Sequence, residues 1–219
     1  ICDGSIRSGK TTVMSLSFVM WAMETFDGEN LALCGKTIQS LRRNVIRQLK
    51  NMLLSRGYQV EEHRSENYLI IRKGPVENTF YLFGGKDEGS QDLVQGITLA
   101  GVFFDEVALM PESFVNQATG RCSKKGFKFW FNCNPEGPDH YFKTEWIDKR
   151  TEKKLIRIHF NMYDNLSLAP EVIESYERRY KGVFYDRFIR GLWVLASGLI
   201  FRYFAEDDLP YLFDDSEIF

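Results

Sequence analysis

The chain has 219 residues, of which 44% are hydrophobic and 18 are phenylalanine, so it can form one large domain or one domain and part of a second. No apolar run approaches the roughly 18 residues of a transmembrane helix and no signal peptide is visible, so we expect no membrane partner. The net charge of −2 is uneven: six of the 30 acidic residues follow residue 204, and the mildly basic remainder is compatible with nucleic-acid binding.

A phosphate-binding loop stands at the start of the chain. The stretch GSIRSGKTT follows three strand-like residues and has the spacing Gly-x-x-x-x-Gly-Lys-Thr. Gly4 and Gly9 permit a tight turn whose backbone N–H groups point at phosphates, and a helix that begins near Lys10 adds its positive end. We expect Lys10 to contact the β- and γ-phosphates of ATP and Thr11 to bind Mg²⁺. The residues predicted to bind the nucleotide are Gly4, Ser5, Ile6, Arg7, Ser8, Gly9, Lys10, Thr11 and Thr12.

The next elements alternate between helix and strand, which is typical of an α/β sheet protein. The expected elements are a buried helix at 13–23, a strand at 30–35, a helix at 37–57 that ends at Gly57, and two strands at 67–74 and 78–85 joined by the Gly74-Pro75 turn. On the helix at 37–57, the arginines Arg42, Arg43 and Arg47 form a basic face. This face is able to contact phosphate groups, and a solvated or ion-paired surface is the alternative interpretation.

A pair of acidic residues ends the next strand. The run LAGVFFDE predicts a buried strand at 99–106, which delivers Asp105 and Glu106 to the sheet edge where the phosphates lie. Asp105 is predicted to hold Mg²⁺ through water, and Glu106 to act as the general base that polarises the attacking water. Kinases and many GTPases lack a glutamate beside this aspartate, so the pair favours an ATPase.

Two asparagines end a later strand. The remaining expected elements are a helix at 111–123 opened by Pro111, strands at 127–135 and 153–162, two short helices broken at Gly182, and a strand at 197–204. Asn132 and Asn134 close the strand at 127–135, beside the same edge of the sheet. Their amides can donate to a γ-phosphate oxygen or accept from the attacking water, so we predict a role in catalysis.

An arginine is expected to neutralise charge in the transition state. Arg7 lies inside the loop, three residues before Lys10, and we favour it as a finger that acts within its own subunit. Arg121 follows the helix after the Asp-Glu strand and could face its own site or that of a neighbour. The cysteines and histidines show no metal-ligand spacing, so we expect reduced core cysteines at Cys2, Cys34, Cys122 and Cys133.

In this order the motifs resemble those of a known family. GSIRSGKTT, QGITLAGVFFDE, FNCNP and GVFYDRFIRGLWVLASGLIF are similar to the ATPase domain of the terminase large subunit of tailed phages and prophages, from Gly4 to about Phe204. The last stretch is the most distinguishing, because it contains the Gly-x-Trp segment of this family at 191–193. One departure is that the third motif starts with Asn132, where many relatives have Thr or Ser.

The resemblance implies a P-loop NTPase of the ASCE type, an α/β fold with a mostly parallel central sheet, flanking helices and a small helical lid subdomain. The implied domains are an ATPase core at 1–162, a lid and linker at 163–195, and the start of a truncated C-terminal nuclease domain at 196–219. Nuclease activity is expected only in the full-length protein, whose nuclease residues would lie beyond Phe219.

The same resemblance implies a Mg²⁺-dependent ATPase that translocates double-stranded DNA into a procapsid. The implied partners are double-stranded DNA, the portal protein, the small terminase subunit and further copies of the chain in a ring on the procapsid. The implied location is the cytoplasm of the host bacterium.

Three other interpretations stay open. A DNA helicase or translocase-type P-loop ATPase unrelated to packaging would carry full helicase motifs, which we do not find. A small-molecule kinase would need an arginine-rich lid and no catalytic glutamate, so Glu106 counts against it. A non-catalytic adaptor would only bind nucleotide. Four intact residues argue against it: Lys10, Thr11, Asp105 and Glu106.

Overall fold

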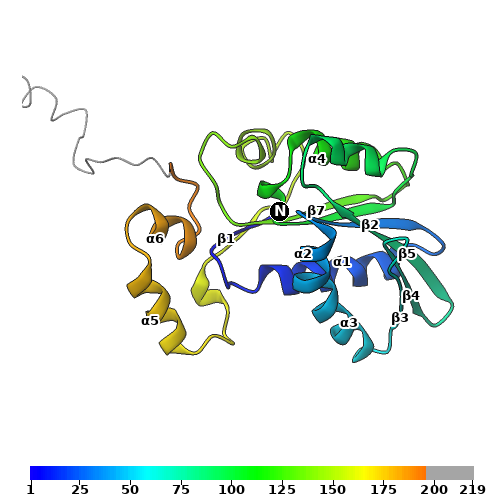
Figure 1. Cartoon of the computed structure of the whole chain (residues 1–219), viewed down its shortest axis with the longest axis horizontal. Coiled ribbons are helices and arrows are strands. Elements are labelled where there is room, and N and C mark those ends of the chain that lie inside the picture. Colours follow the sequence, from blue (N-terminus) through cyan, green and yellow to red (C-terminus); the bar gives the residue numbers. More distant parts are fainter. Residues whose placement is uncertain (196–219) are drawn as a thin grey trace, which may run out of the picture.

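The central sheet organises the chain in the computed structural model, which describes residues 1–195 (Figure 1). Within these residues eight strands run in the order β3-β4-β5-β2-β6-β7-β1-β8. Neighbours from β5 to β8 in that order pair in parallel, whereas the β3–β4 and β4–β5 pairs are antiparallel. The strands are β1 (Cys2–Gly4), β2 (Asn30–Gly35), β3 (Gln59–His63), β4 (Tyr68–Lys73), β5 (Val76–Gly84), β6 (Gly101–Asp105), β7 (Lys128–Cys133) and β8 (Ile158–Phe160).

Helices cover both faces of the sheet, with α1 and α3 on one side and α4 on the other (Figure 1). The α-helices are α1 (Lys10–Thr25), α2 (Ile38–Leu41), α3 (Arg47–Leu54), α4 (Glu112–Gly120), α5 (Pro170–Arg179) and α6 (Val183–Phe188). Single turns of π-helix lie at Arg42–Ile46 and Lys143–Ile147, and 3-10 helix lies at Glu88–Val94, Val107–Leu109 and Met162–Asp164. In the described part of the chain, no helix has the length and apolar character needed to cross a membrane.

The two faces of the sheet carry separate apolar layers, because successive side chains of a strand point to opposite faces. On one face Phe18 of α1 packs against Phe103 of β6, with ring centroids 6.0 Å apart. On the other face Phe104 of β6 meets Phe114 of α4 at 6.3 Å. All five residues of β6 are buried, as expected of a parallel strand covered on both sides. The site residues at its end therefore rest on a rigid, fully packed strand.

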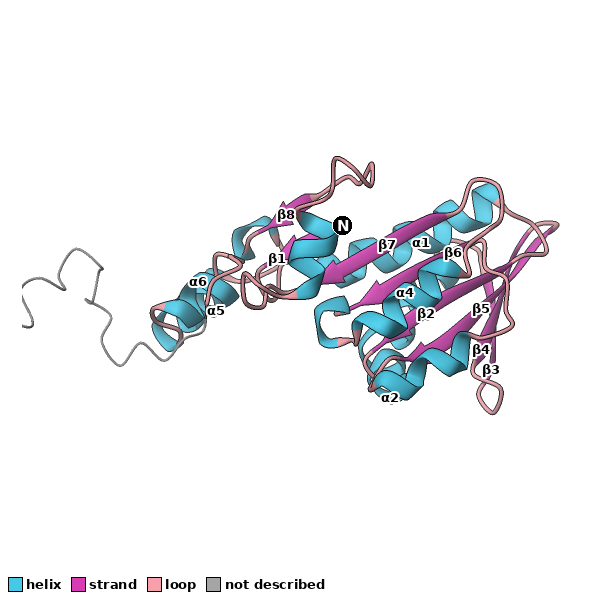
Figure 2. Cartoon of the chain, turned by 90° about the horizontal axis from the view of Figure 1, so that it is seen from above, coloured by secondary structure: helices cyan, strands magenta, loops and turns pink. Residues whose placement is uncertain are grey.

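The strand order brings the three motifs to one edge of the sheet. β7 lies between β1, which leads into the phosphate-binding loop, and β6, which ends at Asp105. The carboxyl ends of parallel neighbours meet at the same edge. Helices α5 and α6 lie apart from the sheet, beyond this edge (Figure 2). The predicted fold class, a P-loop α/β fold with a mostly parallel sheet and flanking helices, is thus confirmed.

Most predicted elements are present, several of them shorter than expected, and short 3-10 and π-helical turns such as Glu88–Val94 and Lys143–Ile147 were not predicted. The helix expected at 37–57 begins after Thr37 and ends at Leu54, and it contains a π-helical turn in its middle. The strand expected at 153–162 shrinks to Ile158–Phe160, where it pairs with β1. β3 was not predicted, since QVEEH has no apolar alternation beyond one valine. The strand expected at 197–204 and the domain expected at 196–219 lie outside the described residues.

Candidate active site

The phosphate-binding loop has a glycine with positive φ at each end. Gly4 has φ +140°, and a Cβ there would lie 1.8 Å from the Phe160 carbonyl oxygen. Gly9 has φ +84° and precedes α1 with no side-chain cap, and the first turn of α1 holds no acidic residue. The first N–H groups of a helix have no intrahelical partner, so the start of α1 is free to bind an anion.

Lys10 folds back onto the loop. Its Nζ donates to the carbonyls of Ser5 at 2.6 Å and Gly4 at 3.2 Å, to the Ser8 hydroxyl at 3.2 Å, and to Asn134 Oδ1 at 3.1 Å. Burial lowers the pKa of Lys10 to about 8. The Ser5 hydroxyl is buried without a hydrogen-bond partner among the described residues, which leaves polar capacity unused in the loop.

A second cluster joins the loop to both neighbouring strands. The Thr11 hydroxyl donates to Asp105 Oδ1 at 3.0 Å. Asn132 Nδ2 lies 2.7 Å from the same oxygen and 2.8 Å from the Thr11 hydroxyl. Burial, and next the charge of Glu106, raise the pKa of Asp105 to about 6. The three side chains therefore form one closed triangle around a carboxylate that a cation would stabilise.

The donors in this triangle fit Mg²⁺. Thr11 and Asp105 offer a hydroxyl and a carboxylate, which are the hard oxygen ligands that Mg²⁺ prefers. Within residues 1–195, no group of three or more His, Cys, Asp or Glu side chains is arranged so that it could hold a metal ion by itself. A cation here would depend on this pair, on water and on phosphate oxygens, as Mg²⁺ does in nucleotide sites.

Glu106 follows Asp105 in a strained backbone conformation. Its φ of +59° lies in the left-handed region, which costs a non-glycine residue roughly 1–2 kcal/mol. The side chain is half-buried, and within the described residues it makes no hydrogen bond or ion pair. Such strain at the end of a buried strand aims the carboxylate in a direction that an extended residue would not give.

Arg7 of the phosphate-binding loop also has a left-handed backbone conformation, and its side chain is turned toward α5. Its φ is +58°, and its Nε donates to the Tyr176 hydroxyl at 3.3 Å. Asn165 Nδ2 donates to the Arg7 carbonyl at 2.6 Å. The remaining loop residues Ile6 and Thr12 are half-buried, and the Thr12 hydroxyl lies 3.4 Å from Gln48 Oε1.

The structure does not bring Arg121 to this site. Arg121 ends α4, and its carbonyl accepts from the Leu99 N–H at 2.9 Å, at the start of the segment that becomes β6. Asp105 lies at the other end of that strand, roughly 20 Å away at about 3.3 Å per residue. Arg121 therefore lies too far from Asp105 to act on this site within the same chain.

Sequence reasoning missed a cluster beneath the loop. Asp3 is fully buried and accepts two hydrogen bonds from Arg157, at 2.8 and 2.7 Å, and one from Trp193 Nε1 at 2.9 Å. Burial alone would raise the pKa of Asp3, but the bonds from Arg157 and Trp193 lower it below its ordinary value. Gly191 packs so closely that a Cβ there would lie 2.5 Å from Ser5 N. The Gly-x-Trp spacing singled out this segment in the sequence, but only the fold shows that it packs against the phosphate-binding loop.

Comparison with known proteins finds clear matches. The family model for the terminase large subunit, T4likevirus-type, N-terminal, matches residues 1–208. The large terminase from a thermophilic bacteriophage is 66% identical, with a TM-score of 0.88 over 94% of this chain and 51% of that chain. The structure of the same protein in complex with ADP is 64% identical, with a TM-score of 0.87 over the same shares. The complex with ATP-gamma-S is 62% identical, with a TM-score of 0.85 over 94% and 50%.

More distant structures share the fold alone. The ATPase domain of the Thermus phage P74-26 large terminase is 14% identical, with a TM-score of 0.62 over 88% of each chain. The search of curated proteins found no match. The chain spans about half the length of the large terminase from the thermophilic bacteriophage, at 51% of it.

Proposed function

The chain belongs to the terminase large subunit family, whose N-terminal part it matches, and on this basis we propose that it is the ATPase motor domain that packages double-stranded DNA into a procapsid. The observation that carries the proposal is the triangle of Thr11, Asp105 and Asn132 beside the Lys10 loop. It supplies oxygen ligands and a phosphate cradle at one edge of the sheet, as phosphoryl transfer requires. The nucleotide complexes of the thermophilic phage relative support ATP as the ligand.

In the proposed mechanism the loop from Gly4 to Thr12 binds the phosphates through its backbone N–H groups. Lys10 exchanges its contacts with the Ser5 and Gly4 carbonyls for phosphate oxygens. Thr11, and Asp105 through water, would hold Mg²⁺, which would supply positive charge to neutralise the phosphates.

Glu106 activates the attacking water. Its carboxylate makes no hydrogen bond or ion pair with another side chain in residues 1–195. It accepts the proton of the attacking water as general base. Asn132 orients Asp105, and Asn134 contacts Lys10, so each asparagine senses the nucleotide through a neighbour. Arg7 contributes positive charge within its own subunit once it leaves Tyr176.

The wider assignment is part of the same proposal, with residues 1–162 as the ATPase core and 163–195 as the lid and linker. We infer double-stranded DNA, the portal protein and the small terminase subunit as partners, in a ring of copies within the host bacterial cytoplasm. The motor role distinguishes this proposal from a DNA helicase, which separates strands instead of moving duplex DNA.

Two substitutions test the site. Lys10→Ala should abolish ATP hydrolysis, because the phosphates lose their fixed cation. Glu106→Gln should keep ATP affinity nearly unchanged while turnover falls by about 10²-fold or more, the typical contribution of a positioned base. Phosphate release measures turnover, and equilibrium binding of a fluorescent ATP analogue measures affinity.

Matched controls remove the same charges from the surface. Lys125→Ala and Glu112→Gln alter exposed residues away from the loop and should hydrolyse ATP at the wild-type rate. Wild-type turnover by Lys10→Ala would exclude this loop as the site. Parallel loss of affinity and turnover in Glu106→Gln would make Glu106 a binding or folding residue.

A further inference from the structure

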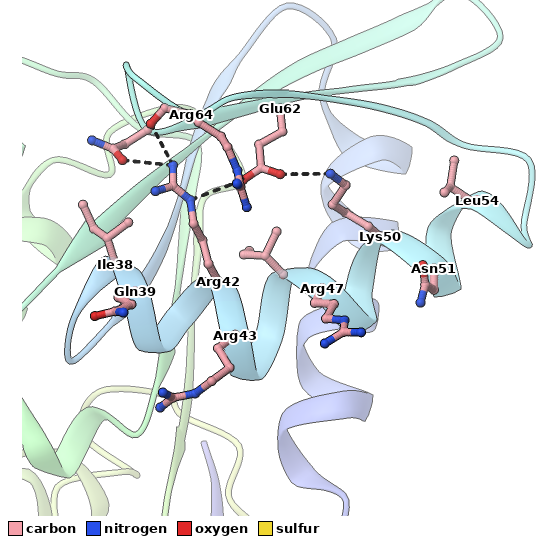
Figure 3. A pocket seen from close by; sticks show the side chains of 12 residues that line it. Ile38, Gln39, Arg42, Arg43, Arg47, Lys50, Asn51, Leu54, Glu62 and Arg64 are labelled. Carbon is pink, nitrogen blue, oxygen red and sulfur yellow. Dashed lines mark hydrogen bonds and ion pairs between the residues drawn. The ribbon is translucent and has the colours of Figure 1, made fainter.

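A groove of about 840 Å³ lies outside the nucleotide site, between the helical segment that carries α2 and α3 and the strand β3 (Figure 3). Its charged lining residues are Arg42, Arg43, Arg47, Lys50, Arg64 and Glu62. Five are basic and one is acidic, so the groove holds a clear excess of positive charge. None of the lining residues is aromatic, and the groove is open to solvent along the helix.

One carboxylate organises the floor of this basic groove. Glu62 accepts from Lys50 at 2.9 Å and lies 3.2 Å from Arg42 Nε and 3.3 Å from Arg64 Nε. Its side chain is only 12% exposed. Arg42 also donates to the Arg64 carbonyl and to Asn67 Oδ1, both at 3.0 Å. The side chains of Arg42, Lys50 and Arg64 are thus fixed in place, and the single negative charge of Glu62 neutralises only one of their three positive charges.

The rim of the groove carries two further cations. Arg43 and Arg47 are exposed and four positions apart on the π-helical turn and the start of α3. Arg43 Nε donates to Asn44 Oδ1 at 3.1 Å, and within residues 1–195 neither arginine is paired with a carboxylate. The π-helical turn is closed by the Arg47 N–H, which donates to the Arg42 carbonyl. Such turns often occur at functional sites.

Two contacts connect the helical segment to the nucleotide site. Gln48, the neighbour of Arg47, accepts from the Thr12 hydroxyl of the phosphate-binding loop at 3.4 Å. Lys36, which precedes the segment, donates to the Leu109 carbonyl at 3.2 Å, shortly after Glu106. The helical segment that lines the groove therefore also contacts the phosphate-binding loop, through Gln48.

We propose that this groove binds the phosphate backbone of duplex DNA, with Arg43 and Arg47 as the phosphate contacts on a floor positioned by Glu62. The proposal rests on the proposed function of the domain as a DNA-translocating motor. Guanidinium groups match phosphate oxygens with two parallel hydrogen bonds, and four of the five cations are arginines. Contacts to phosphate carry no sequence information, which suits a protein that moves along any sequence.

An acidic peptide is the competing ligand for such a surface. Peptide and protein interfaces are anchored by buried aromatic and apolar side chains in pockets. This groove offers no aromatic residue, and its apolar lining is limited to Ile38, Ile46 and Leu54. The lining of the groove therefore favours the phosphate backbone of DNA over an acidic peptide.

The test compares full chains in which Arg43 and Arg47 are both replaced by alanine with the wild type. Fluorescence anisotropy measures binding of a labelled duplex of mixed sequence over a range of salt concentrations. The double variant should bind more weakly, and its slope of log affinity against log salt should fall by about 2, or about 1 for each lost phosphate contact. Hydrolysis of ATP without DNA and the melting temperature should stay unchanged.

Two further variants sharpen the result. Replacement of both arginines by lysine should keep most of the salt slope, because the charge remains. The control Lys125→Ala/Arg178→Ala removes two exposed charges elsewhere and should bind DNA like the wild type.

The outcomes separate the groove from the wider proposal. DNA binding by the Arg43/Arg47 alanine variant that equals the wild type, or an equal loss in the control, overturns the groove assignment and leaves the motor proposal intact. A polyglutamate peptide that binds more tightly than DNA and loses affinity in the same variant would assign the groove to an acidic protein. Failure of the wild type to hydrolyse ATP would overturn the proposed function itself.

Discussion

At the residue scale, Asp105 shows that the site costs the protein stability. The carboxyl group is 5% exposed, and burial together with Glu106 raises its pKa from 3.8 to about 6. A group whose pKa is raised on folding binds its proton more tightly in the folded state, so stability falls as pH rises from about 4 to about 6. At about 1.4 kcal/mol per pKa unit, the penalty above pH 6 is on the order of 1–3 kcal/mol.

Asp105→Asn should therefore stabilise the nucleotide-free protein while it abolishes ATP turnover. We expect the free energy of unfolding to rise by about 1–3 kcal/mol at pH 7.5, with little change near pH 4.5, since the amide carries no charge at either pH. Urea denaturation at both pH values measures the difference. Asp139→Asn, at an exposed position, serves as control and should change little. A variant less stable than the wild type at pH 7.5 would show that the carboxylate is structurally required.

The placement of single residues at this sheet edge was largely predictable, but their contacts were not. The spacing of the loop predicted Lys10 and Thr11, and the apolar strand predicted Asp105. The partners Asn132 for Asp105 and Asn134 for Lys10 depend on β7 lying between β1 and β6. Strand order is set by long-range packing and leaves no local pattern in the chain.

At the element scale, the end of α6 and the residues after it pack against the phosphate-binding loop. We call this segment, residues 188–193, the clamp. The Ile6 N–H donates to the Phe188 carbonyl at 3.0 Å, and the Trp193 indole donates to Asp3. Gly191 has φ +70°, and its backbone lies against Gly4 and Ser5. No side chain fits between the two backbones.

Gly191→Ala should destabilise the protein by at least about 2 kcal/mol, because the left-handed conformation and the close backbone both oppose a Cβ. ATP affinity should fall with it, since Ser5 must shift. Thermal melting and nucleotide binding measure the two effects. Gly120→Ala is the matched control: its Cβ would meet nothing within 4 Å at the exposed end of α4, so it should be neutral or slightly stabilising. Equal behaviour of the two variants would contradict the clamp.

Elements were predicted where apolar pattern and length agree. β2 and β6 are apolar runs that are buried almost throughout, β7 is an apolar run that is buried over its second half, and the Gly74 turn marked the β4–β5 hairpin. β3 could not be predicted from the sequence, because it is a polar edge strand with little apolar pattern of its own that is stabilised by pairing with β4. The π-helical turn at Arg42–Ile46 also has no sequence signal, because it inserts one residue into an otherwise regular helix.

At the scale of the whole molecule, the two candidate arginines lie at opposite ends of the parallel strands. Arg7 belongs to the loop and is held by Tyr176 of α5. Arg121 lies at the far end of β6, on the side away from Asp105. In the ring that we propose, Arg7 could therefore serve its own subunit, whereas Arg121 could serve only a neighbouring one.

Subunit mixing separates the two roles. Subunits with Lys10→Ala are inactive, and increasing amounts of them are mixed into wild-type assemblies while ATP turnover is measured. We expect the double variant Arg7→Ala/Lys10→Ala to cause no loss beyond that of Lys10→Ala, because a finger acting in its own subunit is already silent there. Arg121→Ala/Lys10→Ala provides the comparison, since an arginine that serves a neighbour causes extra loss. Extra loss with the Arg7 variant would move that arginine to an interface.

The close packing of Gly4 against Phe160 and Gly191 should also restrict which chimeras of this chain with a relative can fold. Two stretches far from the loop in the sequence pack against it: a Cβ at Gly4 would lie 1.8 Å from the Phe160 carbonyl oxygen, and a Cβ at Gly191 would lie 2.5 Å from Ser5 N. A crossover between residues 10 and 157 joins a loop from one parent to a clamp from the other. The chimera can carry a perfect phosphate-binding motif and still fail, because one bulkier residue at position 191 fills the space that the loop needs. Exchange between parents is therefore tolerated only where these three stretches are inherited as a compatible set.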